Sequence, residues 1–497
     1  MSVIIDPIIT LLPPLLLIPF IIFFGERRKN LREASILIAA SVLFIINIFL
    51  YQQFLSGQVL QSQTFVIFNG LTLFLKAEPI GIVFGLLASF LWIVTTIYSI
   101  GYMRGHHEKN QTRFYTCFAI AIACVMAAAY SGNLLTLFIA YEAITLSTFP
   151  LVTHAGDAKA KRAGRIYIGV LMGGSILLLM PAIIVTWWIT GTTDFTVGGV
   201  FNEVAISPLW VTVLLCLMVF GTGKAALMPF HSWLPNAMVA PTPVSALLHA
   251  VAVVKTGVFL IIKIIVYIFG LDLINKTNAS EILIFFAAGT IILSSFIAMR
   301  KDNLKARLAY STISQLSYII LAALIANARA IEGAVLHIVA HAFGKITLFF
   351  CAGAIMVAAH KKLVSELAGL GRKMPYTFTA FFIAAISIIG LPPLVGVLSK
   401  FVIIEGIIDS DYYWLLAILT VSSLLNIAYL LPIPFAAFFK ENNNLSNNNE
   451  AIQEAPITCL IAIAITTLAC IVLFVQVDPI MHLLSLIQFD RFNVQSN

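Results

Sequence analysis

Long apolar runs constrain the fold of this chain more than any other feature of its sequence. A helix that crosses a bilayer needs about 20 mainly apolar residues, and the chain contains fourteen such runs, each bounded by charge, Gly or Pro. Only 10% of its residues are charged, whereas a soluble surface requires about 25%. A soluble enzyme is therefore excluded, and we expect an all-α polytopic membrane protein with about 14 transmembrane helices. The expected spans are 7–24, 34–52, 79–101, 113–130, 133–152, 164–190, 207–227, 243–268, 280–299, 306–327, 331–358, 375–408, 412–438 and 456–476.

Two of these runs have features that bear on the topology. The first carries Asp6 and no preceding basic segment, so we expect a retained helix and not a cleaved signal. The twelfth is too long for one straight crossing and contains Gly390, Pro392, Pro393 and Gly396. It is therefore expected to be a broken helix.

The distribution of Lys and Arg predicts the orientation, because cytoplasmic loops carry most of the basic residues near membrane spans. With the amino terminus outside, the outer segments hold only Lys76, Lys276, Arg329 and Arg491. Both termini are then expected on the outer side. The inner segments hold twenty basic residues, which are Arg27, Arg28, Lys29, Arg32, Arg104, Lys109, Arg113, Lys159, Lys161, Arg162, Arg165, Arg300, Lys301, Lys305, Arg307, Lys361, Lys362, Arg372, Lys373 and Lys440.

The remaining five lysines fall inside apolar spans: Lys224, Lys255, Lys263, Lys345 and Lys400. A lysine at the centre of a spanning helix costs about 2.5–3.5 kcal/mol on insertion scales, and packing offers no compensating gain over leucine. A proton or ion path is therefore the default hypothesis. The alternative is snorkelling of the flexible side chain to an interface, which is most plausible for Lys263 because no polar partner is evident near it.

Glu142 is the acid near the middle of a span, and Lys224 is its candidate partner. A Glu–Lys pair in a low dielectric titrates as a coupled unit, and its closing favours both charges. Such a pair can act as a proton switch. The sequence alone does not place the two side chains next to each other.

His337, His341 and Lys345 follow one another at intervals of four residues. At about 100° per residue they occupy one helical stripe roughly 80° wide, and histidine can pass a proton between its two ring nitrogens. A metal site is not favoured, because no third ligand is nearby. His249 and Lys255 are six residues apart and so do not share a face; they would need different neighbours in one relay.

No cofactor is expected from the cysteines or from glycine-rich motifs. The cysteines Cys117, Cys124, Cys216, Cys351, Cys459 and Cys470 lie in apolar runs without a ligand spacing. Gly221 to Lys224 is not a phosphate-binding loop, because Met218 and Ala225 break that motif. Haem, iron–sulfur, zinc and nucleotide binding are therefore not predicted, and neither is binding to nucleic acid.

Three motifs closely resemble the proton-translocating antiporter-like subunits, which occur in Mrp-type Na+/H+ antiporters and in the membrane arm of complex I. They are GKAALMPFHSWLPNAMVAPTPVSALLHAVAVVKTGVFL, from Gly223 to Leu260, HIVAHAFGKITLFFCAGAI, and IGLPPLVGVLSKF. The length of the chain and Lys400 resemble the D-type Mrp subunit more than the complex I chain 4 type, which tends to carry a glutamate in the twelfth helix. One departure is Asn236, where the family commonly has an acid.

The resemblance implies roles for individual residues and a repeat organisation. Glu142 would be the acid of the fifth helix and Lys224 its partner in a broken seventh helix, Lys255 the central lysine with His249 nearby, and Lys400 the terminal group, with His337, His341 and Lys345 between them. The implied divisions are 1–112 for the first three helices, 113–268 and 280–438 for two inverted five-helix repeats, and 439–497 for an Asn-rich loop and the last helix.

The resemblance also implies three functional hypotheses. The first is a proton- and cation-translocating subunit of a multisubunit Na+/H+ antiporter in a bacterial inner membrane, assembled with other membrane subunits. The second is a proton-pumping subunit of an NADH:quinone oxidoreductase or a related redox complex, whose electron chemistry belongs to its partners. The third is a mainly structural role in such a complex, against which the run of ionisable residues argues.

Overall fold

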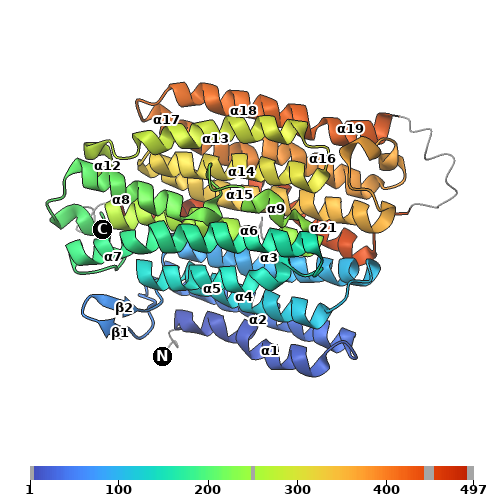
Figure 1. Cartoon of the computed structure of the whole chain (residues 1–497), viewed down its shortest axis with the longest axis horizontal. Helices are drawn as coiled ribbons and strands as arrows, with labels where there is room; N and C mark the ends of the chain where they lie inside the picture. The colour runs from blue at the N-terminus through green and yellow to red at the C-terminus, as the bar shows by residue number, and fades with distance from the viewer. Residues whose placement is uncertain (1–4, 248–251, 441–452, 490–497) are drawn as a thin grey trace.

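A computed structural model describes residues 5–247, 252–440 and 453–489 of the chain (Figure 1). Long helices run side by side along one direction and form a bundle. The helices of the first half are α1 (Leu12–Phe24), α2 (Lys29–Leu55), α3 (Pro79–Gly105), α4 (Gln111–Ala129), α5 (Leu134–Val152), α6 (Ala158–Gly174), α7 (Met180–Thr190), α8 (Pro208–Gly221), α9 (Trp233–Asn236) and α10 (Thr242–Ala246). Those of the second half are α11 (Val253–Lys263), α12 (Leu271–Thr277), α13 (Glu281–Arg300), α14 (Leu304–Leu324), α15 (Ala328–Ala359), α16 (Pro375–Ile389), α17 (Val395–Ile408), α18 (Trp414–Leu430), α19 (Pro432–Phe439), α21 (Ile457–Val475) and α22 (Asp478–Ser485).

Sequence signals set several of the helix ends. Asn133, Asp157, Asn303 and Asn327 each cap a helix, because the side chain accepts a hydrogen bond from the backbone N–H three residues further on. Gly390 ends α16 with a φ of 87°, a conformation that favours glycine. A small antiparallel hairpin of β1 (Phe65–Phe68) and β2 (Leu71–Leu73) is the one sheet in the described part of the chain, and the apolar pattern did not predict it.

Ten helices in the described ranges are long and apolar enough to cross a membrane, or eleven if a bent pair counts as one span. That pair is Val253–Phe269 with Leu271–Thr277, which meet at 81°; the eighth predicted span contains no such bend and is wrong in this respect. The other three predicted spans fail the test for separate reasons. The seventh ends early at Gly221, the twelfth is broken as predicted, and α14 carries many polar side chains although it is almost wholly buried.

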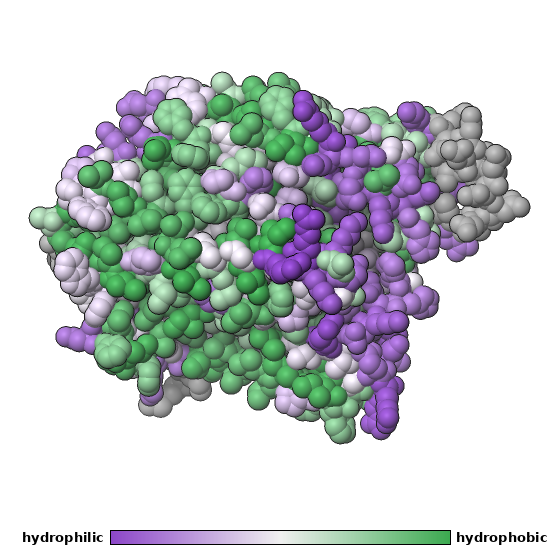
Figure 2. All heavy atoms as spheres, in the orientation of Figure 1, coloured by the Kyte–Doolittle hydropathy of each residue, from purple (hydrophilic) through white to green (hydrophobic). Residues whose placement is uncertain are grey.

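The surface agrees with a bundle that stands in a bilayer. Figure 2 shows apolar side chains over the sides of the bundle and hydrophilic side chains gathered at the end near α19. Lysines from three of the predicted inner segments line one cavity of about 560 Å³ at this end: Lys159, Lys305, Lys361 and Lys362. We call this end the basic face.

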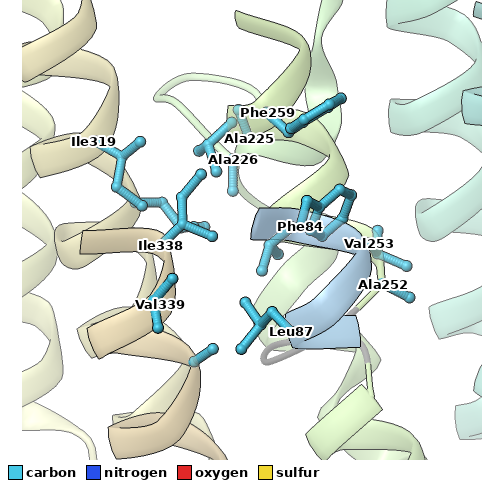
Figure 3. Packing of buried hydrophobic residues seen from close by; sticks show 14 of the residues in the cluster. Phe84, Leu87, Ala225, Ala226, Ala252, Val253, Phe259, Ile319, Ile338 and Val339 are labelled. Atoms are coloured by element: carbon cyan, nitrogen blue, oxygen red, sulfur yellow. The ribbon is translucent and has the colours of Figure 1, made fainter. Parts of the chain in front are cut away.

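Helix α15 is the central element, because it packs against α3, α10, α11, α14, α16, α17 and α21. Apolar contacts hold it in place. In Figure 3, Phe84 and Leu87 of α3 lie between Ile338 and Val339 of α15 on one side and Val253 of α11 on the other. The polar stripe of α15 is thus held within a tightly packed apolar core.

Candidate functional site

Lys224 lies where the seventh span is interrupted, in a single 3-10 turn, Gly223–Ala225, that follows the end of α8. The lysine is fully buried. Its ammonium donates hydrogen bonds of 2.6 Å to the carbonyl oxygen of Tyr141 and to Oγ1 of Thr145, and it lies 3.1 Å from the centroid of the Tyr141 ring. The break in the helix therefore delivers a charged group to the face of α5.

Glu142 adjoins Tyr141 on α5, yet it does not close on Lys224. Its two carboxylate oxygens are buried and have no hydrogen-bond partner among the described residues. No ion pair of 4.0 Å or less joins the two side chains, although they remain within electrostatic range of each other. The structure thus holds the predicted pair in an open arrangement.

Lys255 lies near the start of α11 and is hydrogen-bonded through its ammonium to Nδ1 of His341 on α15. Both residues are buried. The neighbour that Lys255 was expected to need is thus a histidine of the predicted stripe. His249, which the resemblance places near Lys255, lies outside the described residues, as does the Asn-rich segment 441–450.

A close backbone contact brings Lys224 and Lys255 into one region. Gly257 follows Lys255 by two residues, and a Cβ atom added to it would lie 2.6 Å from the carbonyl carbon of Lys224. Side chains larger than hydrogen do not fit there, because real Cβ contacts are longer. The interrupted seventh span and α11 consequently pack with direct backbone contact.

His337 continues the stripe toward the end of the bundle opposite the basic face. Its ring stacks on that of His341 with centroids 6.1 Å apart, and on that of Tyr318 at 5.8 Å. Nδ1 of His337 lies 2.9 Å from Oγ of Ser399, the residue before Lys400. The buried stripe is therefore connected by hydrogen bonds and ring contacts to the broken twelfth span.

Lys400 occupies the break between α16 and α17. Its ammonium donates to the carbonyl oxygen of Ile389 at 2.8 Å and to Oγ of Ser423 at 3.2 Å. The Ile389 carbonyl is free because the helix ends there. A Cβ atom on Gly390 would lie 2.8 Å from Cδ of Lys400, so this glycine provides room for the lysine as well as the turn. Ile389, Gly390, Lys400 and Ser423 line a cavity of about 230 Å³.

Lys345 leads away from the stripe toward the basic face. Its ammonium donates to Oγ of Ser311 on α14 at 2.5 Å, and Tyr429 donates to the same oxygen at 2.8 Å. Serines on α14 therefore act as partners for the buried charge, which explains why this core helix is less apolar than a lipid-facing span.

Two other residues differ from what the sequence indicated. Lys263 was expected to lack partners, and this is wrong: its ammonium forms a buried ion pair with Glu78. Glu405, which lies near Lys400 in the sequence, is bound by Arg329, with its Oε2 2.7 Å from the guanidinium Nε. It is therefore not placed to replace Lys400 at the end of the stripe.

The fold and the site together define a class of protein: a polytopic membrane protein whose core holds a succession of lysines and histidines between two interrupted helices. The chain belongs to the family described as NADH:quinone oxidoreductase/Mrp antiporter, transmembrane, whose sequence pattern matches residues 131–426.

Similar relatives carry the names of two kinds of complex. NAD(P)H-quinone oxidoreductase subunit 5 of Paulinella chromatophora is 32% identical over 76% of this chain and 57% of its own length. The N subunit of the NADH-quinone oxidoreductase of Desulforudis audaxviator is 30% identical over 71% of this chain and 70% of its own. The A/B subunit of a probable K(+)/H(+) antiporter of Rhizobium meliloti is 31% identical over 78% of this chain. The chain spans 39% of that antiporter protein.

Two solved complexes contain chains of the same fold. A chain of the archaeal membrane-bound sulfane sulfur reductase has a TM-score of 0.83 at 22% identity, with 96% of each chain covered. A chain of the Mrp complex from Dietzia sp. DQ12-45-1b also has a TM-score of 0.83, at 17% identity, with 97% of this chain and 98% of that chain covered. The architecture is therefore one that occurs in multisubunit membrane complexes.

Proposed function

We propose that this chain is the ion-translocating subunit of a multisubunit monovalent cation/H+ antiporter. Protons move along Lys224, Lys255, His341, His337 and Lys400. The observation that carries this proposal is the contact between Lys255 and His341, which joins a lysine of the first half of the chain to the histidine stripe of the second. Each of these groups can gain and lose a proton, and each is buried where an unused charge would be costly.

Lys345 provides a branch toward the basic face, and Lys400 provides an end at the opposite face. The carbonyl that a broken helix leaves free stabilises a charged lysine there. The cavity beside Lys400 gives water a place next to its ammonium. The two interruptions, after Gly221 and after Ile389, support a division into repeats at 113–268 and 280–438.

The basic face is cytoplasmic in this proposal, in a bacterial inner membrane, with fourteen crossings and both termini outside. The clustering of basic residues at one end supports this orientation. Cysteines introduced singly near Lys159 and near Lys276 test it. Impermeant thiol reagents added from the periplasm should modify only the second. Modification near Lys159 under those conditions rejects the orientation.

A second candidate is a proton pump within a redox-driven complex, because several relatives are named as quinone oxidoreductase subunits. Other membrane subunits are partners in either case. Purification of the assembled complex followed by vesicle assays separates the two. The antiporter hypothesis expects a pH gradient to collapse on addition of Na+ or K+ without an electron donor. Acidification that requires NADH, together with flavin or iron–sulfur partners, would reject it in favour of the redox complex.

A further inference from the structure

The ion pair of Lys263 and Glu78 lies apart from the succession of lysines and histidines described above. Lys263 is the last residue of α11, and Glu78 immediately precedes α3. The ammonium is 1% exposed and the carboxylate side chain is 9% exposed. Aromatic rings cover the remaining sides of the ammonium, with the centroid of Phe195 at 4.2 Å and that of Tyr267 at 4.5 Å.

The pair connects to the surface through a second lysine. Nζ of Lys76 lies 3.6 Å from Oε1 of Glu78, and the Lys76 side chain is 36% exposed. The three side chains therefore form a line of alternating charge from the core to the aqueous boundary. This boundary is opposite the basic face, because Glu78 adjoins the start of α3 and Arg104 adjoins its end.

The same helix connects the pair to Lys255. Eight residues separate Lys255 from Lys263 on α11, which is about 12 Å along a helix axis. A π-helical turn, Ile264–Phe269, follows Lys263 directly and contributes the Tyr267 ring that covers its ammonium. Such turns occur frequently at functional sites.

Stability alone gives little reason for this pair. Removing two charges from water costs several kcal/mol per ion, and apolar residues of similar size are often as stabilising as a buried ion pair. A buried pair that touches an exposed charge at one end and shares a helix with a relay lysine at the other has a position suited to proton exchange.

We propose that Glu78 and Lys263 form a proton-exchange site that connects Lys255 to the face opposite the basic face. The proton passes between the Lys263 ammonium and a Glu78 carboxylate oxygen, and between that oxygen and water beside Lys76. This inference rests on the proposed function and adds a second opening of the path, distinct from Lys400. The titratable groups that face Lys263 are Glu78, Lys76 and Tyr267.

The test measures cation-dependent collapse of a pH gradient in vesicles that contain the assembled complex, per complex and over a series of outer pH values. Glu78→Gln keeps the shape of the side chain and removes its charge. We expect the rate to fall at least tenfold. We also expect the outer pH of half-maximal rate to fall by about one unit, because more protons are needed to charge a lysine without its carboxylate. Lys76→Glu should move this pH upward, since an added negative charge holds protons more tightly.

Glu33→Gln is the matched control, because Glu33 is an equally buried carboxylate that pairs with Arg104 at the basic face. It should alter the amount of complex without moving the pH of half-maximal rate. If Glu78→Gln fails to accumulate, Lys76→Glu still decides, because its residue is partly exposed. An unchanged pH profile in Lys76→Glu, or a Glu78→Gln complex with wild-type rate and profile, overturns the inference. Lys255→Ala separates the two levels: its loss of transport keeps the proposed function, and its normal transport rejects both.

Discussion

The ammonium of Lys255 on α11 is hydrogen-bonded to Nδ1 of His341 on α15 in the buried centre of the bundle. The two residues are 86 positions apart in the sequence. Neither has a reason of packing to be polar at this depth. Their contact is the point at which the lysines of the first half of the chain meet the histidines of the second half.

Replacement of either residue should therefore interrupt transport. We expect Lys255→Ala and His341→Ala each to lower the rate of cation/proton exchange at least tenfold. The double variant should be little slower than either single one, because the two groups act as a unit. Rates of pH-gradient collapse in vesicles, divided by the amount of complex, give the measurement.

Lys255→Arg supplies the control for charge. Arginine keeps the positive charge and the hydrogen-bonding capacity, but it does not release a proton in proteins. The variant should assemble normally and transport as poorly as Lys255→Ala. Transport at the wild-type rate would mean that the charge at this position is structural and that the proton takes another route.

Glu142→Gln should also abolish transport while the complex still assembles. The carboxylate stands near Lys224 without touching it, so its charge can stabilise the ammonium when the pair closes, and the amide cannot. The check is the vesicle assay together with the amount of assembled complex. Near-normal exchange at normal protein levels would reject the switch between Glu142 and Lys224.

Residue types and their periodicity were enough to predict the apolar spans, the break in the twelfth span and the shared face of His337, His341 and Lys345. The bend after Phe269 was missed, because Gly270 lies at the end of an apolar run that remains uniform in hydropathy. The hairpin β1–β2 was missed because its strands contain only four and three residues.

The partners of the buried charges were harder to predict, because most of them are neutral or distant in sequence. Ser399 and Ser311 are serines within apolar spans, and their polarity was a usable signal. Glu78 lies 185 residues from Lys263 and just outside its span, where an acid is ordinary. Pairing of this kind depends on the tertiary arrangement and is absent from local patterns.

The backbone contact at Gly257 should make this position intolerant of any side chain. Gly257→Ala places a methyl group 2.6 Å from the Lys224 carbonyl carbon, and overpacking of this kind typically costs about 1–3 kcal/mol. We expect reduced thermal stability and slower transport, because the Lys224 turn is pushed away from α11. Gly289→Ala is the control, since no atom lies within 4 Å of its added Cβ and alanine favours a helix. Equal stability of the two variants would contradict the packing argument.

Lys400 should be essential as a proton-binding group, and its chemistry should matter more than its sign. Its ammonium is held by the free carbonyl of Ile389 and by Ser423, beside a cavity. Lys400→Ala removes the group that loads and unloads the proton, so we expect transport to be lost at normal assembly. Lys400→Glu should keep part of the activity, because a buried glutamate can also take up and release a proton.

Lys400→Met serves as the matched control for this last prediction, because it preserves most of the volume of the lysine and removes only its titration. If the loss in Lys400→Ala came from a packing defect beside Gly390, Lys400→Met would transport normally and Lys400→Glu would be the worst of the three, since it places an acid against a carbonyl oxygen. If the group is a proton carrier, Lys400→Met is as inactive as Lys400→Ala, and Lys400→Glu is the most active of the three. The order of the three rates, measured in one vesicle preparation at matched amounts of complex, therefore distinguishes a proton carrier from a packing residue at the broken twelfth span.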